Sequence, residues 1–408
     1  MIDLTLNDTL EGVRDLLHHF AEHEVRPLTL AADRAHGFPI EFLRKVKEMG
    51  ISMGALSKSQ GDDDLGSLGS DGATTRRKKP KTANRLSAIA VEELAWGDAS
   101  FILTLPGPGL GGPPVQFMGT PEQRERFFGV FSKDSEARFG AYGLTEPGAG
   151  SDVAGIRTRC RKDGDAWVLD GTKCYITNGG RADWVVIFAT VDATQGRNAH
   201  RAFVVERGTP GFRVGKIEKK MGLRASETAE LVLEECRVPA ANLLGGEAHY
   251  DSKEGFLGAM KTFDTTRPMV EAMAVGIGRA ALERASLHAK EAGVFRSRSL
   301  RAVQIADGLA AASRKLEAAR LLTWRASWMA DEGVPNAREA SMSKAYAATA
   351  ALEATSMAVQ AMGAAGCAGD SLVEKWFRDI KVFDIFEGTG QIQRVVIAKR
   401  LLEGLKSF

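Results

Sequence analysis

The stretch Tyr142-Gly-Leu-Thr-Glu-Pro-Gly-Ala-Gly-Ser-Asp152 marks the point at which the character of the sequence changes. Its glycines and its proline predict sharp turns that expose backbone N–H groups, and Thr145 and Ser151 add hydroxyls. Such a loop can hydrogen-bond a phosphate or a planar heterocycle, although a glycine-rich segment between two elements is more often only a turn. The choice between these two interpretations depends on the rest of the chain.

The hydrophobic pattern divides the 408 residues into three regions. Apolar residues recur at helical spacing before the loop, which predicts a helical domain over 1–139, interrupted by a Pro106-Gly-Pro-Gly109 break. Short β-rich runs separated by turn signals then predict an antiparallel β domain over 140–247. A long apolar stripe with three-or-four spacing predicts a helix bundle over 248–408. We therefore expect a mainly α fold with a central β domain.

Composition narrows the class of protein. The net charge of +2 gives no reason to expect nucleic-acid binding. Cys160, Cys174, Cys236 and Cys367 show no CxxC spacing, so we expect neither a disulfide framework nor a metal site. No apolar run reaches about 18 residues, and no secretory signal opens the chain. The sequence predicts a cytoplasmic protein with no membrane segment.

The segment 57–85 is unusual within the first region. It joins an acidic block, a Gly/Ser run and a basic block, with almost no large apolar residues. Such a composition predicts a solvated surface loop. The alternative is a basic patch that grips phosphates or an acidic carrier protein.

Two further segments carry residues suited to chemistry. Gly171-Thr-Lys-Cys-Tyr-Ile-Thr-Asn-Gly-Gly180 places Tyr175 and Thr177 on one face of a predicted strand, where a ring could stack and a hydroxyl could bond its edge. Phe386-Glu-Gly-Thr-Gly-Gln-Ile-Gln-Arg394 places Glu387 between an apolar run and a Gly-x-Gly turn. Burial raises the pKa of a carboxyl toward the value wanted in a general base. The simpler alternatives are a core tyrosine and a surface glutamate.

Taken in this order, the three segments resemble the acyl-CoA dehydrogenase family. The resemblance runs from about residue 8 to 405 and extends to Phe263-Asp-Thr-Thr-Arg-Pro268 and Lys220-Met-Gly-Leu-Arg224. It implies an N-terminal helical domain, a β-barrel-like middle domain and a C-terminal four-helix bundle. It also implies FAD, lying between the β domain and the bundle and reaching a neighbouring subunit of a homotetramer. The reduced flavin would pass its electrons to an electron-transfer flavoprotein.

The resemblance assigns a role to each matching residue. Glu387 is the implied catalytic base, and Thr266, at the family's alternative base position, cannot serve. Glu271 lies one turn after Arg267 and could pair with it at i,i+4 spacing, and we expect Glu271 to be a structural residue. The implied cofactor contacts are Tyr142, Leu144, Thr145, Gly150, Ser151, Tyr175, Thr177, Phe295, Gln360, Gly363, Thr389 and Gln391. The implied substrate contacts are Ser151, Phe263, Asp264, Arg267 and Gly388.

The implied reaction is the α,β-dehydrogenation of an acyl-CoA thioester to the trans-2-enoyl-CoA. The α-proton of a thioester is acidic only when the carbonyl oxygen accepts hydrogen bonds, since negative charge develops there. The donors implied by the resemblance are the backbone N–H of Glu387 and a ribityl hydroxyl of FAD. Glu387 would take the α-proton while the β-hydrogen leaves as hydride to flavin N5.

Three departures from the family pattern keep alternatives open. Ala292 stands where the family often carries Arg, the usual Gln is displaced to Gln304, and Gly363-Ala364 replaces a Gly-Gly pair. They leave open part of the FAD pyrophosphate site and the choice between a homotetramer and a heterotetramer. The alternative functions are an acyl-CoA oxidase, a desaturase of acyl groups tethered to a carrier protein, and a non-catalytic flavin-bound relative.

Overall fold

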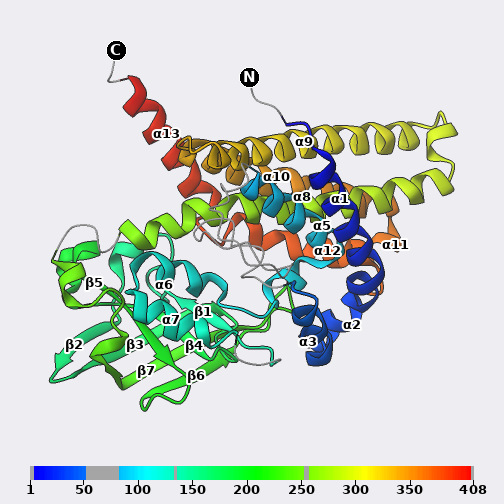
Figure 1. Cartoon of the computed structure of the whole chain (residues 1–408). Coiled ribbons are helices and arrows are strands. Elements are labelled where there is room, and N and C mark those ends of the chain that lie inside the picture. The colour runs from blue at the N-terminus through cyan, green and yellow to red at the C-terminus, as the bar shows by residue number, and fades with distance from the viewer. Residues whose placement is uncertain (1–3, 52–81, 133–135, 252–256, 406–408) are drawn as a thin grey trace, which may run out of the picture. The chain divides into compact units, whose positions relative to one another are not determined.

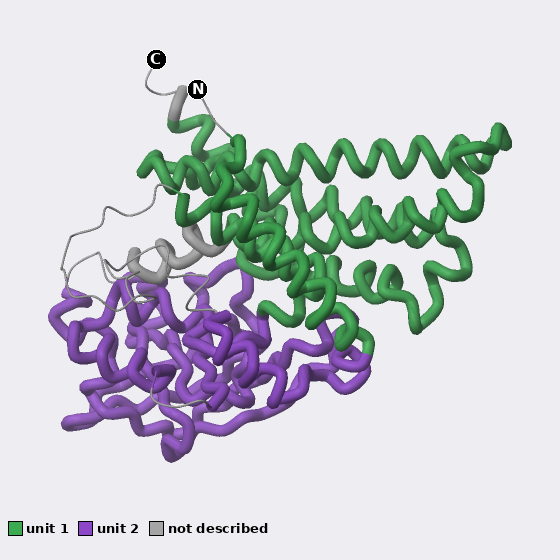
Figure 2. Tube along the Cα trace, turned by 45° about the vertical axis from the view of Figure 1, so that its right-hand side comes forward, with its two compact units in different colours: residues 1–30, 55–102, 266–408 green, residues 31–54, 103–265 purple. Residues whose placement is uncertain are grey.

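The structure is a computed structural model that describes residues 4–51, 82–132, 136–251 and 257–405, with 257–266 and 404–405 as backbone only. Its chain forms two compact units (Figure 2). The helical unit comprises residues 1–30, 55–102 and 266–408, and the β unit comprises 31–54 and 103–265. Most of the predicted 57–85 loop, as far as residue 81, lies outside the described residues, and its predicted end is wrong because residues 83–85 are helical.

The β unit is built on a seven-stranded sheet with the strand order β1-β4-β2-β3-β7-β6, in which β5 also pairs with β4. The strands are β1 (Gly140–Gly143), β2 (Arg159–Asp163), β3 (Ala166–Thr177), β4 (Trp184–Thr190), β5 (His200–Glu206), β6 (Phe212–Ile217) and β7 (Thr228–Pro239). The purely antiparallel sheet that we expected is wrong in one respect, because β4 pairs in parallel with both β1 and β2. The chain between β1 and β4 is long enough for the crossover that a parallel pair needs.

Strand β4 is the centre of this unit, since all seven of its residues are buried. Val185, Ile187 and Ala189 pack into an apolar cluster on one face of the sheet. Trp184, Val186 and Phe188 pack into a second cluster with side chains of α6 (Gly112–Met118) and α7 (Pro121–Gly129). A strand buried on both faces reads as a continuous apolar run, which explains the sequence Trp184-Val-Val-Ile-Phe188. The short helix α3 (Ile40–Glu48) also belongs to the β unit.

The helical unit is dominated by three long helices (Figure 1). They are α8 (Leu257–Glu291), α9 (Leu300–Asp331) and α10 (Ala337–Met362), and α9 and α10 lie side by side. Around them are α1 (Asp8–Phe20), α5 (Ala83–Leu103), α11 (Ala364–Cys367), α12 (Leu372–Ile380) and α13 (Gly390–Leu405), while α2 (Thr29–Ala35) begins at the boundary with the β unit. In the described part of the chain, no helix combines the length and the apolar character needed to cross a membrane.

Helix α5 is nearly fully buried and approaches α8 closely at Gly276. A Cβ atom at Gly276 would lie 2.3 Å from the carbonyl oxygen of Glu92, so only glycine allows this contact. At the other end of α5, Asp98 leaves helical geometry and Lys375 of α12 bridges it to Asp379 at 3.1 and 2.5 Å. This fully buried triad fixes the kink that ends the regular part of α5.

Candidate functional site

In the β unit, a buried ion pair between Lys173 and Glu146 holds the loop 142–152 in place. Lys173 of β3 is fully buried, and its Nζ donates to Oε1 of Glu146 at 2.6 Å and to the carbonyl oxygen of Leu144 at 3.2 Å. The Glu146 carboxylate also accepts from the backbone N–H of Arg157 at 2.6 Å and of Thr158 at 3.0 Å. The loop is therefore pre-organised from within the protein, which an ordinary surface turn would not require.

The ionisation of this pair follows from its burial. Burial lowers the pKa of the Lys173 ammonium to about 8, against the opposing effect of the Glu146 carboxylate. The pKa of Glu146 lies below its ordinary value: burial raises it, but the charge and hydrogen bond of Lys173 outweigh that effect. Lys173 and Glu146 were not among the residues singled out from the sequence, although both lie inside the two motifs.

The loop presents its predicted contact residues unequally. Gly150 and Ser151 are exposed, and Tyr142 and Thr145 are half-buried. Leu144 is buried in the apolar cluster, and its carbonyl oxygen accepts from Lys173.

Tyr175 is held outward by a local irregularity of β3. It has a positive φ of 59° and lies in a register shift between Lys173 and Ile176 in the pairing with β7. Its side chain is 67% exposed, while its neighbours Cys174 and Ile176 are buried. Thr177 is half-buried, so the two predicted contact residues share the outward side as the sequence indicates. A left-handed non-glycine residue is strained, and such strain is concentrated at functional sites.

Glu387 lies in the turn between η10 (Lys381–Asp384) and α13 of the helical unit. It is half-buried with a positive φ of 52°, and Gly388 follows with a φ of 92°. The fully buried Gln393 donates from Nε2 to the carbonyl oxygen of Gly388 at 3.2 Å, and a Cβ at Gly388 would lie 2.5 Å from this nitrogen. The Thr389 hydroxyl accepts from the N–H of Ile392 at 3.3 Å and so caps α13. The turn is thus tightly specified around the predicted base.

The charges near Glu387 differ from those that the sequence suggested. Glu271 of α8 is 1% exposed, and neither of its carboxyl oxygens has a hydrogen-bond partner. Glu271 therefore makes no hydrogen bond to Arg267, although the charge of Arg267 lowers the pKa of Glu271. Burial raises the pKa of Glu271 well above its ordinary value, and Lys344 of α10 is the strongest cation acting against this rise. Helical spacing brings two side chains to one face, but packing between α8 and α10 decides which charges meet.

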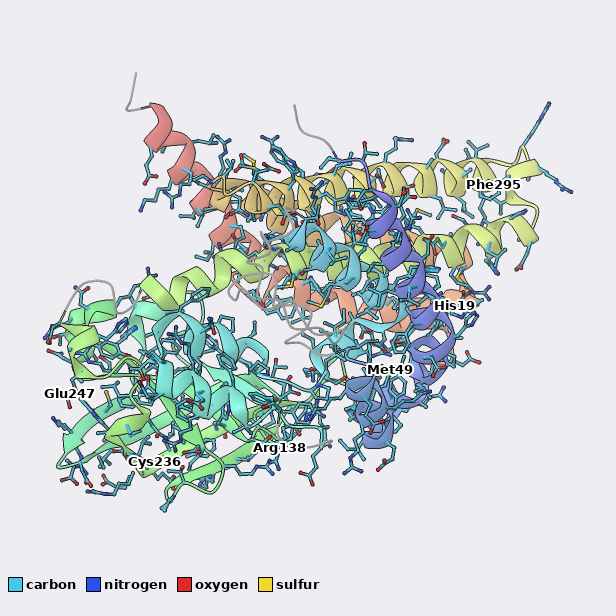
Figure 3. All side chains as sticks on the ribbon, viewed as in Figure 1. His19, Met49, Arg138, Cys236, Glu247 and Phe295 are labelled. Atoms are coloured by element: carbon cyan, nitrogen blue, oxygen red, sulfur yellow. The ribbon has the colours of Figure 1, made fainter. Side chains whose placement is uncertain are left out.

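A second set of predicted contacts lies elsewhere in the helical unit. Phe295 is 53% exposed at the turn between α8 and α9 (Figure 3), and Gly363 lies near Arg301 at the start of α9. Gln360 borders an open cavity of about 380 Å³ between α9 and α10. Lys344 and Gln360 lie about 24 Å apart along the axis of α10, because an α-helix rises by 1.5 Å per residue. Within this unit, the contacts at Phe295, Gln360 and Gly363 are thus separate from the turn at Glu387.

The remaining predictions have simple outcomes. Gln391 is exposed at the start of α13, and Arg267 is buried on α8. The side chains of Phe263 and Asp264 lie outside the described residues, although both belong to the backbone of α8. Among the described residues, no group of three or more His, Cys, Asp and Glu side chains is arranged to hold a metal ion.

Comparison with known proteins identifies the family. Residues 141–236 match the acyl-CoA dehydrogenase middle domain, and residues 253–402 match the acyl-CoA dehydrogenase C-terminal domain. The short-chain specific acyl-CoA dehydrogenase of Clostridium acetobutylicum is 36% identical over 403 residues, which cover 98% of this chain and 100% of the relative. The cyclohexane-1-carbonyl-CoA dehydrogenase of Geobacter metallireducens is 43% identical over 319 residues, covering 78% and 82%.

A solved structure indicates the same family as the sequence relatives. Butyryl-CoA dehydrogenase from Megasphaera elsdenii matches 98% of this chain and 100% of its own, with a TM-score of 0.83 and 33% identity. The match extends over the helical and the β units alike. The chain belongs to the acyl-CoA dehydrogenase family.

Proposed function

We propose that this protein is an FAD-dependent dehydrogenase that converts an acyl-CoA thioester into the trans-2-enoyl-CoA, with Glu387 as the base that removes the α-proton. The observation that carries the proposal is the turn around Glu387, where a carboxylate in a strained left-handed conformation is fixed by Gly388 and Gln393. Backbone strain at a single acidic residue costs free energy, and it is maintained where a function depends on the position of that residue.

The residues of the β unit fit a flavin. Tyr175 offers an exposed aromatic ring, Thr177 a half-buried hydroxyl, and Ser151 an exposed one. A Cβ atom at Gly148 or Gly150 would meet nothing within 4 Å, so the loop presents backbone to its surroundings without obstruction. A planar heterocycle with hydrogen-bonding edges suits this combination of ring, hydroxyls and backbone. When bound, FAD supplies the acceptor for the β-hydrogen and its two electrons.

The chain itself performs the proton chemistry. Glu387 takes the α-proton, and its own backbone N–H is the donor that we assign to the thioester carbonyl, where negative charge develops. Arg267, Phe263, Asp264 and Ser151 are the proposed contacts of the CoA thioester. Together these groups bind the substrate and orient it, so that its α-carbon faces the carboxylate.

The relatives favour a small acyl group. Two of them are named for short-chain and butyryl substrates, and a third is named for a cyclic acyl-CoA, cyclohexane-1-carbonyl-CoA. We accordingly propose a short or cyclic saturated acyl-CoA as the substrate. We further propose that an electron-transfer flavoprotein is the electron acceptor and that the protein works in the cytoplasm.

The proposed assembly is a homotetramer. The distance of about 24 Å along α10 supports it, because contacts at Phe295, Gln360 and Gly363 are then available to the cofactor of a second copy. Size-exclusion chromatography with light scattering tests the tetramer.

The test of the reaction is anaerobic bleaching of the flavin's visible absorbance by a panel of saturated acyl-CoAs. We expect rapid bleaching by butyryl-CoA or by cyclohexane-1-carbonyl-CoA, with the corresponding enoyl-CoA as the product. If FAD is bound and none of the acyl-CoAs bleaches it, the proposed reaction is wrong. Oxygen consumption in the absence of another acceptor would instead identify an oxidase.

A further inference from the structure

The segment directly before Glu387 is held by a buried lysine that the proposed reaction does not use. Lys344 is 1% exposed, and its Nζ donates a hydrogen bond to the carbonyl oxygen of Phe383. The same Nζ lies 5.5 Å from the centroid of the Phe386 ring, within the range of a cation–π contact. The rings of Phe383 and Phe386 meet edge to face with their centroids 5.0 Å apart. One ammonium therefore holds both the backbone and the aromatic side chain that precede Glu387.

Glu271 of α8 is a second buried titratable group whose environment includes Lys344. Its carboxyl is 1% exposed and makes no hydrogen bond. A buried polar group without a partner costs free energy, so its presence beside the turn calls for a compensating interaction. The charges that act on it are those of Lys344, Glu387 and Arg267, and Asp384 acts on Lys344 in addition. The cluster thus combines two cations from α8 and α10 with carboxyl groups from α8 and from the turn.

The two groups differ in their effect on Glu387. A nearby ammonium favours the ionised form of a carboxylate, and the charges of Lys344 and Glu387 act on each other. Burial raises the pKa of Glu271 well above its ordinary value, and the charge of Glu387 raises it further. A carboxyl that keeps its proton has no charge with which to oppose that of Glu387.

We propose that Lys344 is a positioning residue for the base: it fixes the turn that carries Glu387 and favours the charged form of Glu387. The inference rests on the proposed function, in which Glu387 is the base. A base needs to be ionised before the substrate binds, and a buried ammonium that holds the turn supplies this condition.

The experiment compares Lys344→Met and Glu271→Gln with wild type in the pH dependence of the flavin-bleaching rate constant. Removing the cation is expected to move the acidic limb of the profile to higher pH by roughly one unit, the order given by charges several ångströms apart in a protein. Glu271→Gln keeps the shape of the side chain and is expected to leave the limb near its wild-type position, because the raised pKa of Glu271 means that the substitution removes no charge. Lys344→Arg is expected to restore most of the wild-type profile. Lys399→Met, an exposed position on α13, serves as the control.

A second readout does not depend on turnover. Infrared difference spectra of the purified protein across pH, with Glu387→Gln as the reference that removes its band, follow the carboxyl of Glu387 directly. The expected result is an upward shift of the Glu387 titration in Lys344→Met and none in Glu271→Gln, a difference that a general effect of substitution in the buried cluster would not produce.

Failure of the inference and failure of the proposed function give different results. A Lys344→Met profile that coincides with wild type, or an equal shift in Glu271→Gln, overturns the inference while leaving Glu387 as the base. Bleaching that survives in Glu387→Gln overturns the proposed function itself. If Lys344→Met does not fold, Lys344→Gln replaces it, and the absence of an upward shift in its infrared titration contradicts the inference.

Discussion

Replacing Lys173 by methionine removes the buried cation beneath the 142–152 loop while roughly keeping the volume of the side chain. The Glu146 carboxylate would then be left buried with only the N–H groups of Arg157 and Thr158 as partners. Breaking a buried ion pair by removing one partner typically costs about 3–5 kcal/mol. The two remaining hydrogen bonds place this case near the lower end, at about 3 kcal/mol.

The consequence is measurable as a melting temperature and as cofactor retention. For a unit of this size, a loss of about 3 kcal/mol lowers Tm by roughly 6–12 °C. The matched control is Lys162→Met, since Lys162 pairs with Glu247 at 2.7 Å on the surface of the same unit, with both side chains about half exposed. Exposed pairs contribute about 0–1 kcal/mol. We also expect weaker FAD binding only in Lys173→Met, measured by flavin fluorescence on titration of the apoprotein. A Tm and an FAD affinity equal to those of the control would refute the reasoning.

Three further predictions follow from the same structure. Because burial lowers the pKa of Lys173 to about 8 from its ordinary 10.5, the unfolded protein binds more protons between those values. The contribution of this group to the free energy of unfolding therefore rises with pH across that window, and urea titrations of wild type should show an upward slope that Lys173→Met lacks. Cys160, Cys174 and Cys236 are buried, and burial raises the pKa of each thiol, whereas Cys367 is exposed. Mass spectrometry after brief alkylation of the native protein should find label at Cys367 alone, and label at a buried thiol would contradict the described packing. Gly388→Ala forces a Cβ to within 2.5 Å of the Gln393 amide at a φ of 92°. It should cost about 1–2 kcal/mol and lower the bleaching rate more than it lowers FAD affinity, unless the turn at Glu387 is irrelevant to catalysis.

Much of the architecture could be predicted from local pattern. The change of hydrophobic period and the break at Pro106-Gly-Pro-Gly109 anticipate the helix–sheet–helix order, and α5 does end at Leu103 before this break. The reason is that periodicity and proline act on the backbone within a few residues. The parallel pairing of β1 with β4 could not be read in this way, because it depends on a crossover between distant strands.

In the candidate site, too, some features follow from local sequence and others from packing between distant segments. The glycine-rich loop, Tyr175 and Glu387 stand out in the sequence because their unusual local composition coincides with unusual backbone geometry. The bulge that turns Tyr175 outward and the buried Lys173–Glu146 pair result from packing between strands. The same is true of Glu271, on which Lys344 of α10 acts more strongly than the i,i+4 neighbour Arg267.

The central claim is that Glu387 is the base of an acyl-CoA dehydrogenase, and Glu387→Gln tests it most directly. The substitution keeps the size of the side chain and removes its capacity to take a proton. We predict that the variant retains bound FAD but is bleached by butyryl-CoA or cyclohexane-1-carbonyl-CoA at least about 100-fold more slowly than wild type, the lower bound typical of losing a general base. Bleaching at the wild-type rate in a variant that still holds FAD would show that another group removes the α-proton.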